Sequence, residues 1–280
     1  MLHDEIKVIF DAMRVSPMND WVGGTDPESV GDATAAIVQD LTPPGSESKI
    51  LDFGCGIGRG MVSLLKLIPT PSALVGIDIM PPVIKFCDEH IKPVYPFAKF
   101  ELLDDSNIHY DQFIDGQPRS SKEAIVDKYA SSFTHAYAFS VFTHIARKDF
   151  EGLLRFIYAL IAPGGRFLFT CFSLTEHSRS MITNGQSIFP FQESTFVDDG
   201  DVFLGNKSDP LAFIAFDQTL LERIVWGAGL VITKVQYGCW MGGNIGASLQ
   251  DVFVVTKPFE LQKDGEVVMT PLVDRTNIQH

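Results

Sequence analysis

The sequence is poor in basic residues. Only 22 lysines and arginines stand against 35 aspartates and glutamates, which gives a formal net charge of −13. A nucleic acid would be repelled by such a chain unless its basic residues were clustered, and the sequence contains no such cluster. We therefore expect no nucleic-acid partner.

Cysteine is also scarce, and long apolar runs are missing. The four cysteines lie far apart and form no Cys-x-x-Cys pair, so neither a zinc site nor a disulfide framework is indicated. No stretch of about 18 apolar residues could span a bilayer. The first five residues lack the basic and apolar segments of a secretory signal. These absences predict a cytoplasmic protein with no metal and no membrane span.

The most informative stretch is residues 50–59, Ile-Leu-Asp-Phe-Gly-Cys-Gly-Ile-Gly-Arg. It reads as an apolar strand, a turn with glycine at every second position, and the start of an apolar-periodic helix. Glycine in such a turn permits positive φ and lets a ligand approach the main chain. The dinucleotide fingerprint G-x-G-x-x-G is not satisfied, because Arg59 or Met61 occupies the place of the third glycine.

A second landmark is Asp78, twenty residues beyond Gly58, at the end of an apolar strand over residues 73–77. A carboxylate at the tip of the second strand is suited to bonding both hydroxyls of a ribose. The glycine turn and this aspartate together indicate a nucleoside-containing cofactor rather than a turn that only packs helix on strand.

The rest of the chain alternates between strand and helix patterns. We expect an amphipathic helix over residues 2–14, with Ile6, Ile9, Phe10 and Met13 on one side, and a helix from Pro27 to about residue 39. Further strands are predicted at residues 98–103, 133–139 and 166–172, and a final antiparallel pair at 231–236 and 251–256. Helices are predicted from Pro81, over 148–160 and over 218–226. This alternation predicts a mostly parallel sheet with right-handed crossovers.

Three segments have no regular pattern of their own. Residues 104–128 are polar and irregular, and a connection of that length is often functional. Residues 173–209 mix polar residues with phenylalanines, which suggests a lid or substrate-pocket insertion, or else a surface ornament. Residues 162–165, Ala-Pro-Gly-Gly, are expected to stop a helix before the fifth strand. Asp264-Gly265 is a turn signal that could form a small hairpin in the tail.

Four landmarks in this order resemble the class I S-adenosylmethionine (SAM) dependent methyltransferases, and the resemblance covers most of the chain. They are Asp52 to Gly58, Asp78, the strand at 132–137 with the Ser-Val-Phe-Thr-His at 140–144, and Ala162 to Gly165. The resemblance implies an α/β fold: a Rossmann-like, seven-stranded, mostly parallel sheet with an antiparallel C-terminal hairpin and helices on both faces. The domains expected are a helical leader over 1–45, the methyltransferase domain over 46–258 with an insertion at about 173–210, and a tail over 259–280.

The resemblance also implies the cofactor and its contacts. S-adenosyl-L-methionine is the expected cofactor, with its methionine end near the glycine turn and its ribose at Asp78. Asp104 is expected at the adenine amino group, and Cys55 is expected as a small buried side chain rather than a nucleophile. The full set of expected cofactor residues is Asp52, Gly54, Cys55, Gly56, Gly58, Arg59, Asp78, Ile79, Asp104, Asp105, Phe139 and Ser140.

Other short segments of the sequence resemble a bacterial branch of this methyltransferase family that is often linked to polysaccharide or glycan modification. They are Val22-Gly23-Gly24 with Asp26-Pro27, Asp104-x-x-Asn107-x-x-Tyr110, and Tyr237-Gly238-Cys239-Trp240 followed by Gln250-Asp251. The chain departs from that branch at residues 110–113 and 216–218, and at His135, where an aspartate is usual. The acceptor expected is an oxygen of a small molecule or a sugar or glycan.

An oxygen acceptor benefits from a base that removes its proton. His144, after the fourth strand, is the candidate base, with Tyr110 as a weaker catalytic candidate; alternatively His144 caps the next helix or braces a loop. Two other functions stay open: a SAM-binding partner or regulatory subunit without catalysis, and a protein methyltransferase whose insertion forms a groove. No stretch reads as a dimer seam, so the oligomeric state is open.

Overall fold

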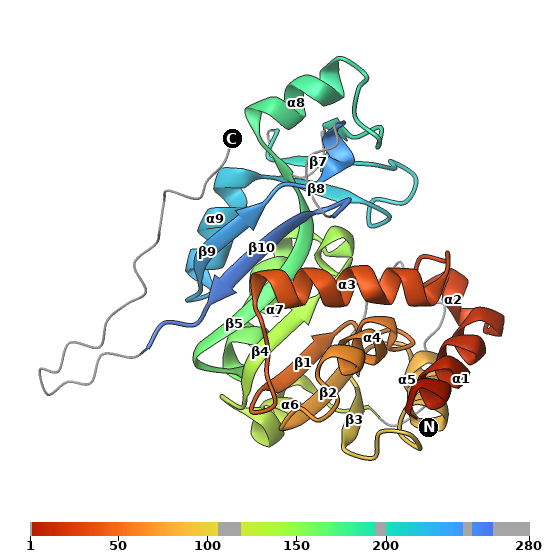
Figure 1. Ribbon diagram of the computed structural model, residues 1–280. Helices are drawn as coiled ribbons and strands as arrows, with labels where there is room; N and C mark the ends of the chain where they lie inside the picture. The colour runs from red at the N-terminus through yellow and green to blue at the C-terminus, as the bar shows by residue number, and fades with distance from the viewer. Residues whose placement is uncertain (1, 106–118, 194–199, 243–247, 260–280) are drawn as a thin grey trace, which may run out of the picture. The chain divides into compact units, whose positions relative to one another are not determined.

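The computed structural model describes residues 2–105, 119–193, 200–242 and 248–259 (Figure 1). The chain divides into two units. Residues 1–129 and 133–139 form the N-terminal unit, and residues 130–132 and 140–280 form the C-terminal unit. Each unit is described by itself. The domain boundaries expected from the sequence stay a prediction.

The N-terminal unit holds a four-stranded parallel sheet in the order β3-β2-β1-β4. Strands β1 and β2 are buried along almost their whole length, as expected of parallel strands covered on both faces. Its elements are α1 (Leu2–Val15), α2 (Met18–Trp21), α3 (Pro27–Leu41), β1 (Lys49–Phe53), α4 (Arg59–Leu67), β2 (Ala73–Asp78), α5 (Pro81–His90), β3 (Ala98–Leu102), α6 (Lys122–Tyr129) and β4 (Phe133–Ala138).

Two helices of the leader follow the sequence pattern closely. Helix α1 buries the four apolar residues predicted for its inner side. Helix α3 starts with Pro27 at its first position, and the side chain of Asp26 accepts a hydrogen bond from the amide of Ser29 at 2.9 Å. Helix α3 packs along α4 (Figure 1). The approach is close at Gly31, where a Cβ would lie 2.4 Å from the carbonyl oxygen of Arg59.

The C-terminal unit is built on one long strand, β5. Residues 166–171 of β5 pair antiparallel with β10, which also pairs antiparallel with β9; residues 172–174 pair parallel with β8. Its elements are η2 (Phe142–His144), α7 (Arg147–Leu160), β5 (Ile161–Leu174), α8 (Glu176–Thr183), β6 (Gln192–Glu193), β7 (Val202–Leu204), β8 (Ile214–Asp217), α9 (Gln218–Gly227), β9 (Val231–Gln236), η3 (Cys239–Met241) and β10 (Asp251–Thr256).

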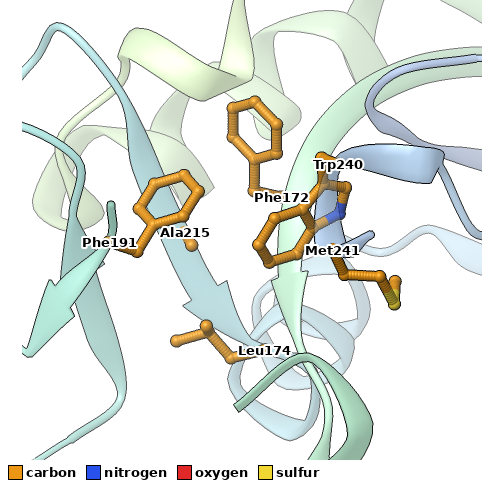
Figure 2. Packing of buried hydrophobic residues seen from close by; sticks show 6 residues of the cluster. All are labelled: Phe172, Leu174, Phe191, Ala215, Trp240 and Met241. Carbon is orange, nitrogen blue, oxygen red and sulfur yellow. The ribbon is translucent and has the colours of Figure 1, made fainter. Parts of the chain in front are cut away.

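An aromatic cluster forms a core of the C-terminal unit at the end of β5. Figure 2 shows Phe172, Phe191 and Trp240 turned toward one another. The ring of Phe172 lies 5.2 Å from Phe191 and 5.3 Å from Trp240, both edge to face. The buried members of the cluster are Phe172, Leu174, Phe191, Ala215, Trp240 and Met241.

The predicted fold class is confirmed. All seven expected strands are present, as β1 to β5 with β9 and β10, and the short strands β6, β7 and β8 are additional. The N-terminal strands are parallel, and β9 and β10 pair antiparallel as predicted.

Three local predictions need correction. Helix α7 ends at Leu160, before residues 162–165, as predicted, but these residues lie inside β5, because Gly164 and Gly165 exchange backbone hydrogen bonds with Lys257. The segment 104–128, read as irregular, contains most of α6, whose polar sequence buries only Ile125 and Tyr129. The segment 173–209 contains α8, with a capping box between Thr175 and Ser178, and the paired strands β6 and β7. The hairpin predicted at residues 264–265 lies outside the described residues.

Candidate cofactor site

The glycine turn between β1 and α4 is built from residues with positive φ. Gly54, Gly56 and Gly58 have φ values of 73°, 52° and 82°. The amides of Gly54 and Cys55 both donate to the carbonyl oxygen of Ile77, at 2.8 and 3.1 Å, and the amide of Gly58 donates to that of Cys55. These hydrogen bonds tie the start of the turn to the end of β2.

Asp78 at the end of β2 is bonded to the glycine turn. Its Oδ2 accepts from the amide of Gly56 at 2.8 Å, and its Oδ1 accepts from the amide of Met80 at 2.9 Å. Burial raises the pKa of this carboxyl group, and the backbone donors oppose the rise. Each oxygen retains acceptor capacity, so the two oxygens can accept bonds from two neighbouring hydroxyls.

Two of the glycines also let the chain pack tightly against the turn. A Cβ on Gly58 would lie 2.3 Å from the Cδ1 atom of Ile91, and one on Gly56 would lie 3.0 Å from Cγ1 of Val22. Glycine at these positions is thus favoured by φ, and a larger residue would also have to displace the side chain of Val22 or Ile91.

The leader loop, residues 22–25, is fastened against the glycine turn. The guanidinium group of Arg59 donates to the carbonyl oxygens of Val22 and Gly24. The side-chain amide of Asn19 donates to the carbonyl oxygen of Thr25 at 2.9 Å. The structure thus places this loop beside the turn that is expected to hold the cofactor.

Asp52 lies opposite Tyr137 across the paired strands β1 and β4. Burial raises the pKa of Asp52 to about 8; the charge of Asp78 adds to the rise, while Tyr137 and the charge of Arg59 oppose it. Burial likewise raises the pKa of Tyr137. The Tyr137 hydroxyl is buried, and the Asp52 carboxyl is the polar group with which it interacts. Tyr137 was not predicted from the sequence, although a tyrosine inside a buried strand was the available signal.

The other predicted cofactor residues of this unit have varied surroundings. Cys55 is buried next to Cys87, and its contact with that thiol together with burial raises its pKa, so Cys55 is a neutral thiol. Asp104 is exposed, whereas Asp105 forms an ion pair with Lys122 at 2.7 Å. Ile79 and Phe139 are half-buried. Tyr110 lies outside the described residues.

Two predicted site residues belong to the C-terminal unit. Ser140 has a φ of 56°, which is rare outside glycine; its amide donates to Oγ1 of Thr170, and its hydroxyl accepts from Gln250 at 2.7 Å. Nδ1 of His144 lies 2.9 Å from the carbonyl oxygen of Leu211. Helix α7 begins after Ala146 without a side-chain cap, so His144 braces a loop and does not cap that helix.

The N-terminal unit fits a nucleoside cofactor that carries an amino acid. The two oxygens of Asp78 match a pair of ribose hydroxyls. The buried Asp52 carboxyl, with the Tyr137 hydroxyl beside it, offers polar atoms to a cationic group. A glycine turn after β1 and an aspartate at the end of β2, on a Rossmann-like arrangement of parallel strands, are the features of a SAM-dependent methyltransferase.

Comparison with known proteins agrees with this class. Residues 28–202 match the family model of a methyltransferase domain, and the chain belongs to that family. An uncharacterized methyltransferase of Emericella nidulans is 25% identical over 156 residues, which cover 54% of this chain and 52% of the relative. The chain thus spans about half the length of this curated relative.

Solved structures share the fold. The PH0226 protein of Pyrococcus horikoshii superposes with a TM-score of 0.53 at 16% identity, covering 88% of this chain and 98% of that one. The 1,6-didemethyltoxoflavin-N1-methyltransferase of Burkholderia thailandensis, crystallised with 1,6-didemethyltoxoflavin and S-adenosylhomocysteine, has a TM-score of 0.51 at 15% identity, covering 91% and 90%. The predicted enzyme class and the predicted cofactor, SAM, are confirmed at the level of family and fold. In the described parts of the chain, no helix is long and apolar enough to cross a membrane.

Proposed function

We propose that this protein transfers a methyl group from SAM to an oxygen of a small-molecule or sugar acceptor. The observation that carries the proposal is the bonding of the Asp78 carboxylate to the glycine turn, with the buried pair Asp52 and Tyr137 on the neighbouring strands. SAM supplies an electrophilic methyl group on a sulfonium centre. The task of the chain is therefore to hold and orient the two reactants, an effect worth up to about 7–11 kcal/mol in well-oriented systems.

His144 is the proposed general base. A neutral imidazole that faces a carbonyl oxygen with Nδ1 must carry its proton there, since a carbonyl cannot donate. The contact with Leu211 supports a tautomer with the basic lone pair on Nε2. In this tautomer His144 can take the proton of an acceptor hydroxyl. Tyr110 stays a weaker candidate.

The surroundings of His144 favour an acceptor with an apolar face. Its ring centroid lies 5.9 Å from that of Phe213, which in turn lies 5.0 Å from Phe189. Aromatic side chains suit planar rings and also the C–H faces of sugars. The Burkholderia thailandensis relative acts on a small molecule at nitrogen, which supports a small-molecule acceptor but leaves oxygen and nitrogen to be distinguished. Glycan modification and a cytoplasmic location stay predictions.

Titration with S-adenosylhomocysteine, followed by incubation of the protein with methyl-labelled SAM and phenols, sugars or cell extract, tests the proposal. We expect cofactor binding and labelling of a hydroxyl compound. Labelling of a protein, or binding without any transfer, would favour the protein methyltransferase or the non-catalytic alternative.

The His144→Gln variant tests the base. Turnover should fall about 100-fold or more, the usual effect of losing a positioned base, while the affinity for S-adenosylhomocysteine stays within about twofold. His177→Gln is the matched control, because His177 is exposed on α8 of the same unit. Normal turnover in His144→Gln would remove this residue from the mechanism and would favour a nitrogen acceptor, which has less need of a base.

A further inference from the structure

The leader loop, residues 22–25, holds an unfavourable backbone conformation. Its last three residues, Gly23, Gly24 and Thr25, have φ values of 102°, 62° and 63°. Glycine adopts positive φ readily, but a β-branched residue such as threonine does so rarely and at a cost in free energy. Such a conformation persists only where the surrounding structure holds it. The loop therefore depends on contacts made from outside residues 22–25.

Those contacts come from Asn19 and Arg59. The side-chain amide of Asn19 donates to the carbonyl oxygen of Thr25 at 2.9 Å. The guanidinium group of Arg59 donates to the carbonyl oxygen of Gly24 at 3.1 Å and to that of Val22. Asn19 lies just before the loop in α2, whereas Arg59 is 35 residues beyond Gly24 and is the first residue of α4, next to the glycine turn. Arg59 thus links the loop to the turn.

The side chain of Val22 also packs on the glycine turn. A Cβ on Gly56 would lie 3.0 Å from Cγ1 of Val22. The amide of Gly56 donates to Oδ2 of Asp78 at 2.8 Å, and this is the carboxyl group expected to bond the ribose. The loop, the turn and Asp78 therefore form one continuous set of contacts, so a cofactor bound at the turn would lie beside the loop.

The shape of the arginine side chain suits this connection. A guanidinium group is planar and presents several N–H donors at fixed angles, so it can hold two carbonyl oxygens at once. Burial lowers the pKa of Arg59 to about 10, and the charge of Asp52 opposes the fall, so the group stays charged at neutral pH. A lysine at this position would keep the charge but lose the planar arrangement of donors. Substitution can therefore separate the two properties.

We propose that Arg59 is a positioning residue that acts on the cofactor through the leader loop: its guanidinium group holds residues 22–25 as a wall that retains the bound cofactor. This inference rests on the proposed binding of SAM at the glycine turn. It goes beyond that binding, because it gives the leader loop a role in retaining the cofactor and gives Arg59 an indirect one. A direct contact between Arg59 and the cofactor is the alternative that the test distinguishes.

Stopped-flow measurement of S-adenosylhomocysteine binding provides the test. In Arg59→Gln the ligand should dissociate about tenfold faster than in wild type, the scale of losing hydrogen bonds from a charged donor. Association should change by less than about threefold, since an opened loop does not obstruct entry. Arg59→Lys should also release the ligand faster, and full recovery of the wild-type rate by lysine would overturn the inference. Arg155→Gln controls for the loss of one positive charge, because Arg155 is exposed on α7 of the other unit.

The Gly23→Ala variant distinguishes the indirect role from a direct contact. Alanine disfavours a φ of 102°, so this change releases the loop through its backbone, and the added Cβ would meet Nη2 of Arg59 only at 4.0 Å. Gly23→Ala alone should speed dissociation. Adding Arg59→Gln should then raise the rate by less than about twofold, because the loop is already released. A further rise of about tenfold would overturn the inference in favour of direct contact with the cofactor.

Hydrogen exchange provides a readout of the loop itself. The amide of Gly24 donates to the carbonyl oxygen of Asn19 at 2.8 Å, so its exchange rate reports whether the loop keeps its conformation. This amide should exchange faster in Arg59→Gln than in wild type, and more slowly in wild type when S-adenosylhomocysteine is bound. Unchanged exchange and dissociation in Arg59→Gln and Gly23→Ala would overturn the inference and leave the proposed function intact. No binding by the wild type would overturn the proposed function itself.

Discussion

Each of the two units buries an aspartate, and the two aspartates differ in what surrounds them. Asp251 in the C-terminal unit accepts hydrogen bonds from the amides of Ser173 and Gly238, both at 2.7 Å, and from the indole of Trp240 at 3.0 Å. Asp52 in the N-terminal unit faces a phenol and a second acid. Burial raises the pKa of Asp251 to about 6 and that of Asp52 to about 8.

The difference shows how donors decide the role of a buried carboxyl group. Three donors hold Asp251 as a structural anchor that ties β5 and β10 to the chain around Trp240. Asp52 has fewer donors, so its carboxyl oxygens can still accept hydrogen bonds from a ligand. The C-terminal unit is thus held by aromatic packing and a satisfied carboxylate, whereas the N-terminal unit buries two acids, Asp52 and Asp78, at the glycine turn.

The largest effect is expected from removing the aromatic packing of the C-terminal unit. Phe172→Ala should lower the free energy of unfolding by about 3–5 kcal/mol, because the ring is fully buried among Phe191, Trp240 and their neighbours. Below its unfolding transition, the variant should bind S-adenosylhomocysteine within about threefold of wild type, since the glycine turn belongs to the other unit. Denaturant unfolding and calorimetry measure the two quantities.

Ile188→Ala is the control for this prediction. Ile188 belongs to the same unit and is 58% exposed, so its truncation should change stability by less than about 0.5 kcal/mol. A comparable loss in both variants, or loss of cofactor binding in folded Phe172→Ala, would contradict the separation of structural and cofactor roles between the units.

A second, smaller effect tests the glycine turn. Gly58→Ala should cost about 1–2 kcal/mol because of the left-handed φ, and the end of the Ile91 side chain must also move. It should also weaken binding of S-adenosylhomocysteine. Gly152→Ala in α7 is the matched control: a Cβ there meets nothing within 4 Å, so alanine should stabilise by about 0.5–1 kcal/mol. Equal stability of Gly58→Ala and wild type would show that the turn tolerates a side chain.

The sequence predicted most of the N-terminal unit because its signals are local. The periodicity of α1, the Asp26-Pro27 cap of α3 and the apolar runs of β1 and β2 can each be read within a dozen residues. Fewer features of the C-terminal unit were predicted, because its structure depends on contacts between residues that are far apart in the sequence. Gly164 lies inside β5 despite its positive φ of 76°, since its amide bonds to Lys257, nearly a hundred positions away, and no local pattern indicates that.

The residues of the candidate site also fall into two groups: those that a local sequence pattern indicates and those that only the folded structure brings together. The glycines and Asp78 stand at the ends of apolar runs, where the sequence indicates a ligand. Tyr137 was missed because its pairing with Asp52 depends on the register between β1 and β4. The loop bracing by His144 depends on Leu211, which is 67 residues further along the chain.

The smallest expected effect is a change in how steeply the free energy of unfolding depends on pH. It compares Asp52 with Asp251 directly. Both pKa values are raised above the ordinary 3.8, so the folded protein holds more protons than the unfolded chain between about pH 4 and the folded pKa. Stability therefore falls as pH rises through that window, which ends near pH 6 for Asp251 and near pH 8 for Asp52. Between pH 6 and 8, Asp52→Asn should reduce the decline in the free energy of unfolding by about 1 kcal/mol per pH unit. Asp251→Asn should keep the decline while losing stability at every pH, because its amide group cannot accept all three hydrogen bonds. Denaturant unfolding at several pH values measures both, and equal slopes in wild type and Asp52→Asn would show that Asp52 is ionised throughout this range.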